Sequence, residues 1–158
     1  MLGGKSIKGG VMDRIHYEEL CRKLVQGCND AIIYSDRDGV IRLWNSGAEQ
    51  MLGFSAEEAI GRSLDIFIPE NQRARHWEGY FRVMQTGTTR YAAELLAAPA
   101  IRKDGTRIST EFSMTIIRDD AGEIAGTAAV MRDVTARWQK EKALRTRLAE
   151  LEKVSSGG

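Results

Sequence analysis

The amino-acid sequence predicts an α+β fold, in which an antiparallel sheet has helices crowded on one face and a further helix at each end. Two observations support this fold class. Short β-rich runs, separated by turn residues, lie on both sides of a central stretch that carries helix-start and helix-stop signals. Residues 11–27 and 134–154 instead space apolar residues among charged ones, which is typical of amphipathic helices.

The first two strands are predicted to form a hairpin. Two β-rich runs flank residues 36–39, which read Asp-Arg-Asp-Gly, and Gly39 suits the positive φ that such a turn requires. Asn45 follows the second run. Its side chain can cap a short helix that extends through Met51.

The middle of the chain is predicted to be helical. Ser55 and Glu58 have the spacing of a capping box. Pro69 suits the first turn of a longer helix. We expect that helix to run to about Thr86 and to stop at Gly87, because glycine readily takes the left-handed conformation that ends helices.

The second half of the chain is predicted to contain three strands, at residues 90–101, 107–116 and 123–131. The middle strand alternates sharply between apolar and polar residues, so one of its faces is expected to be buried. The residues expected on the buried face are Ile108, Phe112, Met114 and Ile116, and those on the other face include Arg107, Glu111 and Thr115.

Length and charge limit the classes of protein to consider. The chain has 158 residues, with 23 Lys+Arg, 22 Asp+Glu and a formal net charge of +1, which suits one domain with an appendage. The balance of charge argues against a general nucleic-acid binder, because counterion release needs an excess of Lys and Arg. No apolar run approaches the roughly 20 residues that span a bilayer. Residues 1–10 lack the hydrophobic core of a signal peptide, so we expect a flexible N-terminus and a cytoplasmic protein with no membrane partner.

The reactive residue types are few. Cys21 and Cys28 lie in a predicted helix with roughly 10 Å of rise between them, so a disulfide is out of reach. His16 and His76 are the only histidines, which excludes a histidine-rich metal cage but permits a single axial ligand. Neither a G-x-S-x-G motif nor a phosphate-binding loop is present, so we expect no enzyme.

The final helix at residues 134–154 is predicted to extend from the domain and to form a parallel dimer stem, ahead of a flexible tail at 155–158. Its apolar heptad positions are Val134, Leu144, Leu148 and Leu151. Arg137 and Glu141 interrupt this pattern, which predicts a weak coiled coil. The alternative is a solvated helix that folds back on its own domain.

Several short motifs occur in a characteristic order between residues 28 and 137. They are the D-x-x-G hairpin, W-N before a helix, G-F-S-A-E-E, I-G-R-S, R-K-D-G-T-R-I and G-T-A-A-V-M-R-D-V-T. Together they resemble a PAS (S-box) domain, which we assign to residues 28–133. The resemblance implies a five-stranded antiparallel sheet with helices over one face, acting as a sensory or dimerisation module. Asp133 and Thr135 resemble the D-x-T pair at the exit of such domains.

A more specific resemblance lies in residues 67–87, which contain I-P-E, R-x-R-H, G-Y and T-G. This stretch is similar to the haem-binding helix of FixL-type oxygen-sensor PAS domains. The similarity implies a b-type haem whose iron is bound by His76. The other residues that it implies around the haem are Tyr80, Arg82, Leu96, Phe112 and Met114, with Arg82 near the propionates.

Two departures from that pattern affect the chemistry. Gly79 and Tyr80 come one residue later than in the FixL type, and Leu96 replaces the arginine that steadies bound oxygen. Leucine has no donor for a polar iron-bound ligand. Met114 carries a thioether that could be a sixth ligand, or it is apolar lining.

The resemblance leaves two functions open. One is a sensor of a diatomic gas or of redox state, which relays its signal through the C-terminal helix of a homodimer to an output partner outside this chain. The other is a cofactor-free interaction and dimerisation domain, in which His76 is a packing residue. Flavin photochemistry of the LOV type is not expected, because residues 61–75 contain no cysteine.

Overall fold

The structure, a computed structural model, describes residues 13–89 and 94–155. Within these residues, five strands form one antiparallel sheet in the order β2-β1-β5-β4-β3. The strands are β1 (Ala31–Asp36), β2 (Ile41–Trp44), β3 (Leu96–Ile101), β4 (Arg107–Arg118) and β5 (Ile124–Asp133). The helices are α1 (Arg14–Gly27), α2 (Ser46–Leu52), α3 (Ala56–Ala59), the 3₁₀ turn η1 (Leu64–Ile66), α4 (Glu70–Thr86) and α5 (Thr135–Ser155).

The boundaries mostly follow the sequence signals. The predicted strand at 90–101 is observed from Leu96 onward, and residues 90–93 lie outside the described residues. The predicted flexible terminus at 1–10 and residues 156–158 of the predicted tail also lie outside them. Ser155, which we assigned to that tail, is instead the last residue of α5.

Local turn and cap chemistry forms as predicted. Gly39 has a φ of 76° in the β1–β2 turn, and Gly87 ends α4 in the left-handed conformation. Ser55 and Glu58 form a complete capping box at the start of α3. Asn45 caps α2 by accepting a hydrogen bond from the Ala48 amide.

Asn45 has a second role that its sequence position does not reveal. Its side chain is completely buried, and its Oδ1 also accepts from the Ile32 amide at 2.8 Å. Its Nδ2 donates to the carbonyls of Val25 and Asp30 at 2.8 and 3.0 Å. One amide side chain therefore joins the end of α1 to β1, β2 and α2.

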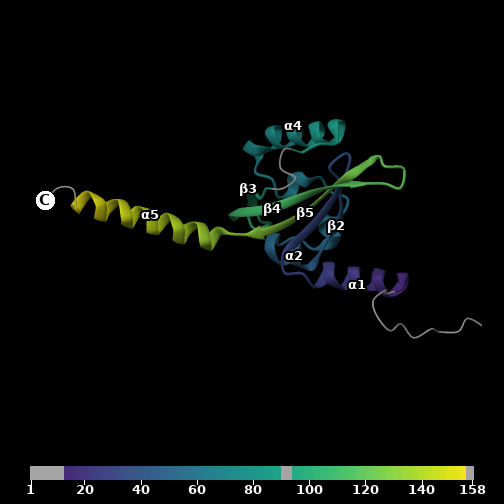
Figure 1. Cartoon of the computed structure of the whole chain (residues 1–158), viewed down its shortest axis with the longest axis horizontal. Coiled ribbons are helices and arrows are strands. Elements are labelled where there is room, and N and C mark those ends of the chain that lie inside the picture. The colour runs from purple at the N-terminus through teal and green to yellow at the C-terminus, as the bar shows by residue number, and fades with distance from the viewer. Residues whose placement is uncertain (1–12, 90–93, 156–158) are drawn as a thin grey trace, which may run out of the picture.

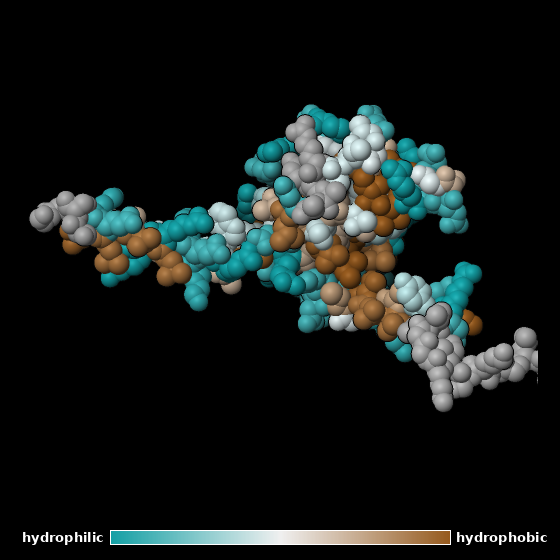
Figure 2. Space-filling model, in the orientation of Figure 1, coloured by the Kyte–Doolittle hydropathy of each residue, from teal (hydrophilic) through white to brown (hydrophobic). Residues whose placement is uncertain are grey.

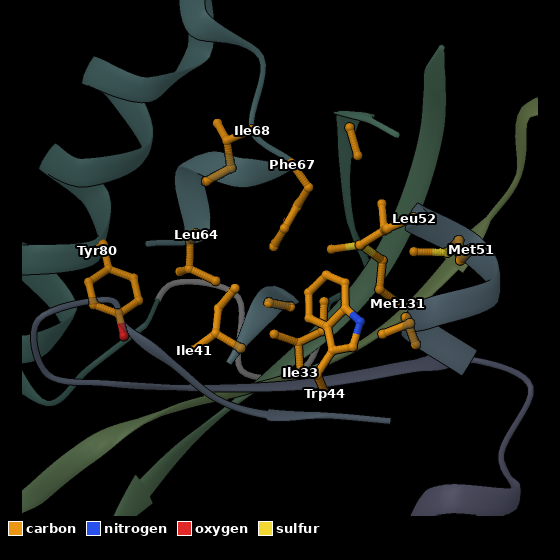
Figure 3. Packing of buried hydrophobic residues seen from close by; sticks show 14 of the residues in the cluster. Ile33, Ile41, Trp44, Met51, Leu52, Leu64, Phe67, Ile68, Tyr80 and Met131 are labelled. Atoms are coloured by element: carbon orange, nitrogen blue, oxygen red, sulfur yellow. The ribbon is translucent and has the colours of Figure 1, made fainter. Parts of the chain in front are cut away.

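The core lies between one face of the sheet and the helices α2 to α4. In β1, Ala31, Ile33 and Ser35 are buried, whereas the residues between them are half-buried on the other face. Ile33 pairs with Trp44 of β2, whose ring lies 5.9 Å from that of Phe67. Figure 3 shows these apolar side chains gathered between the strands and the helices. Burying each large side chain contributes on the order of 1.5–3 kcal/mol.

The two terminal helices lie outside this core. No residue of α1 is buried, and Cys28 lies at its C-cap rather than within it; both cysteines are free. Helix α5 extends away from the sheet as an arm instead of folding back on the domain (Figure 1). Figure 2 shows hydrophobic residues along one side of this arm. Three leucines of α5, Leu144, Leu148 and Leu151, are 54–61% exposed.

No helix in the described part of the chain is long and apolar enough to cross a membrane.

Candidate functional site

Helix α4 is fixed to the sheet by Tyr80. This side chain is buried, and its hydroxyl donates to the carbonyl of Asp36 at 2.5 Å and lies 2.9 Å from Ser35 Oγ. Ser35 Oγ in turn lies 3.5 Å from Thr127 Oγ1 of β5. Burial raises the pKa of the Tyr80 hydroxyl, so the group stays neutral and able to donate. Figure 3 shows the hydroxyl pointing away from α4.

We expect Tyr80→Phe to lower the free energy of unfolding by about 1–3 kcal/mol, because it leaves buried polar groups of β1 without their partner. Urea unfolding followed by circular dichroism measures this change. The matched control is Tyr17→Phe, at a position 60% exposed on α1, which should change stability by less than about 0.5 kcal/mol. Equal effects of the two substitutions would show that the Tyr80 hydroxyl does not anchor α4.

The start of α4 is held by Asp65. The indole Nε1 of Trp77 donates to Asp65 Oδ1 at 2.9 Å, and Arg73 donates to the Asp65 carbonyl at 3.1 Å. The Trp77 ring packs on the β1–β2 turn so closely that a Cβ on Gly39 would lie 2.2 Å from it. Glycine at this position thus serves both the turn and the close approach of α4.

The His76 ring contacts the aromatic rings of both anchors, Trp77 and Tyr80. Its ring centroid is 4.8 Å from that of Trp77 and 5.7 Å from that of Tyr80. Its Nδ1 is buried and has no hydrogen-bond partner among the described residues. Burial lowers the pKa of the imidazole below its usual 6.5, and the negative field of Asp65 opposes this only in part. The ring is therefore neutral at neutral pH, which is the form that binds metals.

The single donor at His76 could serve a metal centre that needs only one ligand from the protein. The described residues contain no group of three or more His, Cys, Asp or Glu side chains that could surround an ion. A haem needs only one or two axial ligands from the protein, since the porphyrin supplies the other four nitrogens. A single histidine with an unpartnered buried nitrogen meets that requirement.

The structure places three of the predicted lining residues on the helix-covered face of the sheet. Leu96 of β3 pairs with Phe112 of β4, and Phe112 pairs with the buried Met131 of β5. Met114 lies two residues further along β4 on the same face, opposite Ala129. All three predicted residues are half-buried.

Arg82 lies elsewhere. Its side chain is 56% exposed and pairs with Glu78, one turn earlier on α4, at 2.8 Å. Such an exposed pair along a helix is weak, so Arg82 can exchange this partner for another carboxylate at little cost.

The junction between β5 and α5 is a hydrogen-bonded unit. Asp133 Oδ1 accepts from the Thr135 amide at 2.9 Å and from its hydroxyl at 2.6 Å, while Oδ2 pairs with Arg102 at 2.7 Å. The Thr135 hydroxyl oxygen accepts from the Ser109 amide of β4 at 2.9 Å. The D-x-T pair therefore caps α5 and also ties it to the sheet. Arg102 could not be assigned to this unit from sequence, because no spacing rule links it to Asp133.

The charge of Asp133 should make the junction sensitive to acid. Burial alone would raise the pKa of its carboxyl, but the hydrogen bonds from Thr135 and the Arg102 guanidinium outweigh burial and hold it below 3.8. Because the folded chain binds this proton less readily than the unfolded chain, the carboxylate stabilises the fold above pH 3.8. That contribution is lost as pH falls through the lower folded value.

We therefore expect Asp133→Asn to destabilise the chain more near pH 6 than near pH 3. Urea unfolding of both chains at several pH values checks this. Asp120→Asn, in the exposed β4–β5 turn, is the control. A stability difference between wild type and Asp133→Asn that is the same at all pH values would contradict the assignment.

Comparison with known proteins identifies the class of the chain. A family model described as the PAS fold matches residues 25–139. The chain therefore belongs to the PAS family, as its motifs predicted. It is a sensory domain of the kind found in signalling proteins.

Two sensor proteins are among its relatives. Sensor protein FixL of Bradyrhizobium diazoefficiens is 30% identical over 151 residues, which cover 96% of this chain and 29% of that protein. Oxygen sensor protein DosP of Escherichia coli is 28% identical over 119 residues, covering 75% of this chain and 15% of that protein. The chain thus spans less than a third of the length of these relatives.

Solved structures support the fold. A PAS domain from Colwellia psychrerythraea superposes with a TM-score of 0.67 at 22% identity, covering 76% of this chain and 98% of that one. An RNA-binding Light-Oxygen-Voltage receptor gives 0.69 at 19% identity, covering 99% of this chain and 43% of that one. At such identities the likeness concerns the fold alone.

Proposed function

We propose that this chain is the sensory module of a bacterial-type signalling protein and binds b-type haem through His76 to sense a diatomic gas or a redox change. The observation that carries the proposal is the buried, unpartnered Nδ1 of a neutral imidazole on α4. The similarity to a protein named sensor FixL and to one named an oxygen sensor supports the same reading.

The residues of this chain have distinct roles in the proposal. His76 supplies the axial nitrogen, and Tyr80 holds α4 in place against β1. When bound, the haem supplies an iron that takes a diatomic ligand or changes oxidation state. Leu96 and Phe112 exclude water on the sheet side, and Leu96 offers no hydrogen bond to a polar ligand. Met114 is either a sixth ligand or further apolar lining.

Arg82 has a conditional role. In the structure it faces solvent beside Glu78. A propionate is a carboxylate, and an arginine can pair with it through two parallel hydrogen bonds, which are stronger than one exposed pair along a helix. We propose that Arg82 turns from Glu78 to a propionate on binding.

The signal leaves through α5. We propose that the chain forms a cytoplasmic homodimer through its terminal helices, and that the output partner lies outside these 158 residues. Helix α5 is tied to β4 through Thr135, and β4 carries Phe112 and Met114. A shift of β4 would therefore reach the helix directly.

A cofactor-free interaction domain is the second candidate, and one observation favours it. The rings of His76, Trp77 and Tyr80 contact one another, with centroids 4.8–5.7 Å apart, and Tyr80 already satisfies backbone groups of β1. In this reading His76 is a packing residue of the aromatic cluster on α4.

Hemin titration of the purified chain separates the two functions. A haem sensor should develop a Soret band that saturates at one haem per chain, and the band should shift on reduction. A spectrum equal to that of free hemin at all ratios would rule out the haem site and favour the interaction domain.

A further inference from the structure

Val134 and the first two turns of α5, residues 134–141, begin at β4, and we call this segment the root. Val134 is buried, and its amide donates to the carbonyl of Ser109 at 2.8 Å. One turn later, Arg137 forms an ion pair with Glu111. The root therefore lies against the domain's own sheet, whereas the rest of α5 extends away from it (Figure 1).

Arg137 connects two carboxylates. Besides its pair with Glu111, its Nε lies 3.6 Å from Glu141 Oε1 on the next turn of α5. The Arg137 side chain is 52% exposed and that of Glu111 is 25% exposed. One guanidinium thus bridges the strand and the first two turns of the helix at the edge of solvent.

The side of the root that faces β4 is continuous with the apolar stripe of the arm. At heptad spacing, this side of the helix carries Val134, Arg137, Glu141, Leu144, Leu148 and Leu151, of which the leucines form the apolar stripe. The first two of these residues contact the sheet, and the leucines are 54–61% exposed. At the root, this side of the helix cannot face its own strand and a second helix at the same time.

We propose that the Arg137–Glu111 ion pair is a clamp that sets where the dimer stem begins. While the clamp is closed, only positions beyond Glu141 pair with the α5 of a second copy. When it opens, the paired seam extends back toward Arg137. This inference rests on the proposed role of α5 as a dimer stem.

The clamp is placed to respond to the candidate site. Glu111 is the neighbour of Phe112 on β4, and the two side chains point to opposite faces of the sheet. On β3, Ala97 pairs with Glu111 and Leu96 pairs with Phe112. A displacement of β4 at Phe112 therefore moves Glu111 with it.

The clamp opens easily, because an exposed ion pair such as Arg137–Glu111 shifts an equilibrium by no more than about fivefold.

Disulfide cross-linking between copies tests the proposal without haem. In a chain carrying Cys21→Ser and Cys28→Ser, Leu148→Cys reports on the stem and Glu141→Cys reports on the root. Paired seam positions lie within the Cα separation that a disulfide needs. We expect Leu148→Cys to cross-link in every background. We expect Glu141→Cys to cross-link about two- to fivefold faster when Glu111→Gln is added.

The matched control is Glu150→Gln, which removes the Arg147–Glu150 pair on α5 without touching β4 and should leave both rates unchanged. Equal rates for Glu141→Cys with and without Glu111→Gln would overturn the clamp while leaving the stem in place. Absence of cross-linking at Leu148→Cys would overturn the stem itself, and the clamp with it. Neither result bears on haem binding, which the hemin titration decides.

Discussion

His76→Ala is expected to abolish saturable haem binding while the chain remains folded. The imidazole is the single donor that the fit to haem depends on, and its buried Nδ1 has no other partner in the described residues. The fold should survive because His76 is only half-buried and alanine is the best helix former. Hemin titration followed at the Soret band measures binding, and far-ultraviolet circular dichroism checks the fold.

The second histidine provides the control. His16 lies on the exposed face of α1, where its Nδ1 is 2.6 Å from an Asp13 carboxylate oxygen. His16→Ala removes one imidazole from the chain and should leave the titration unchanged. If His76→Ala takes up haem as tightly as wild type and with the same spectrum, His76 is not the axial ligand. If both variants and wild type fail to bind, the interaction domain becomes the better reading.

Short-range signals explain why much of the fold could be predicted. A cap such as Ser55 with Glu58 works within one turn of helix, and Gly39 serves a turn between adjacent strands. These features depend on residues close in sequence, so spacing alone reveals them. The alternation in β4 likewise placed Phe112 and Met114 correctly on one face.

The contacts that build the site could not be predicted, because they depend on sheet register and helix placement. Tyr80 was expected beside a haem, but its hydroxyl is used by Asp36, which is 44 residues earlier. Ser35 is two residues after the buried Ile33 in β1, so strand alternation indicates that it too is buried. Its residue type indicates the opposite, because serine is mostly exposed in proteins.

The charged residues in the heptad pattern show the same limit. From sequence, Arg137 and Glu141 interrupt the apolar heptad pattern, which predicts a weak coiled coil. The structure gives Arg137 a partner on β4, which sequence spacing cannot reveal because Glu111 is 26 residues earlier. Arg137, which interrupts the apolar heptad pattern, is thus a residue through which the root contacts the sheet.

Replacing Leu148 and Leu151 by Asp is expected to convert a dimer into folded monomers. These leucines are 57% and 54% exposed on an otherwise charged helix, and burying each against a second copy contributes on the order of 1.5–3 kcal/mol. Losing both should raise the dimer dissociation constant by at least about a hundredfold. The domain should stay folded, because neither leucine belongs to its core. Sedimentation velocity over a range of concentrations measures the shift, and circular dichroism checks the fold.

A control variant must separate the effect of two added negative charges from the effect of losing two leucines of the apolar stripe. Gln139→Asp with Thr146→Asp adds the same two negative charges at the heptad positions farthest from the stripe. This control should sediment as wild type, because its new carboxylates face water in both states. If the Leu148 and Leu151 double variant sediments as the same dimer as wild type, α5 does not hold the chains together. If the control also dissociates, repulsion between arms, rather than the leucines, governs the assembly.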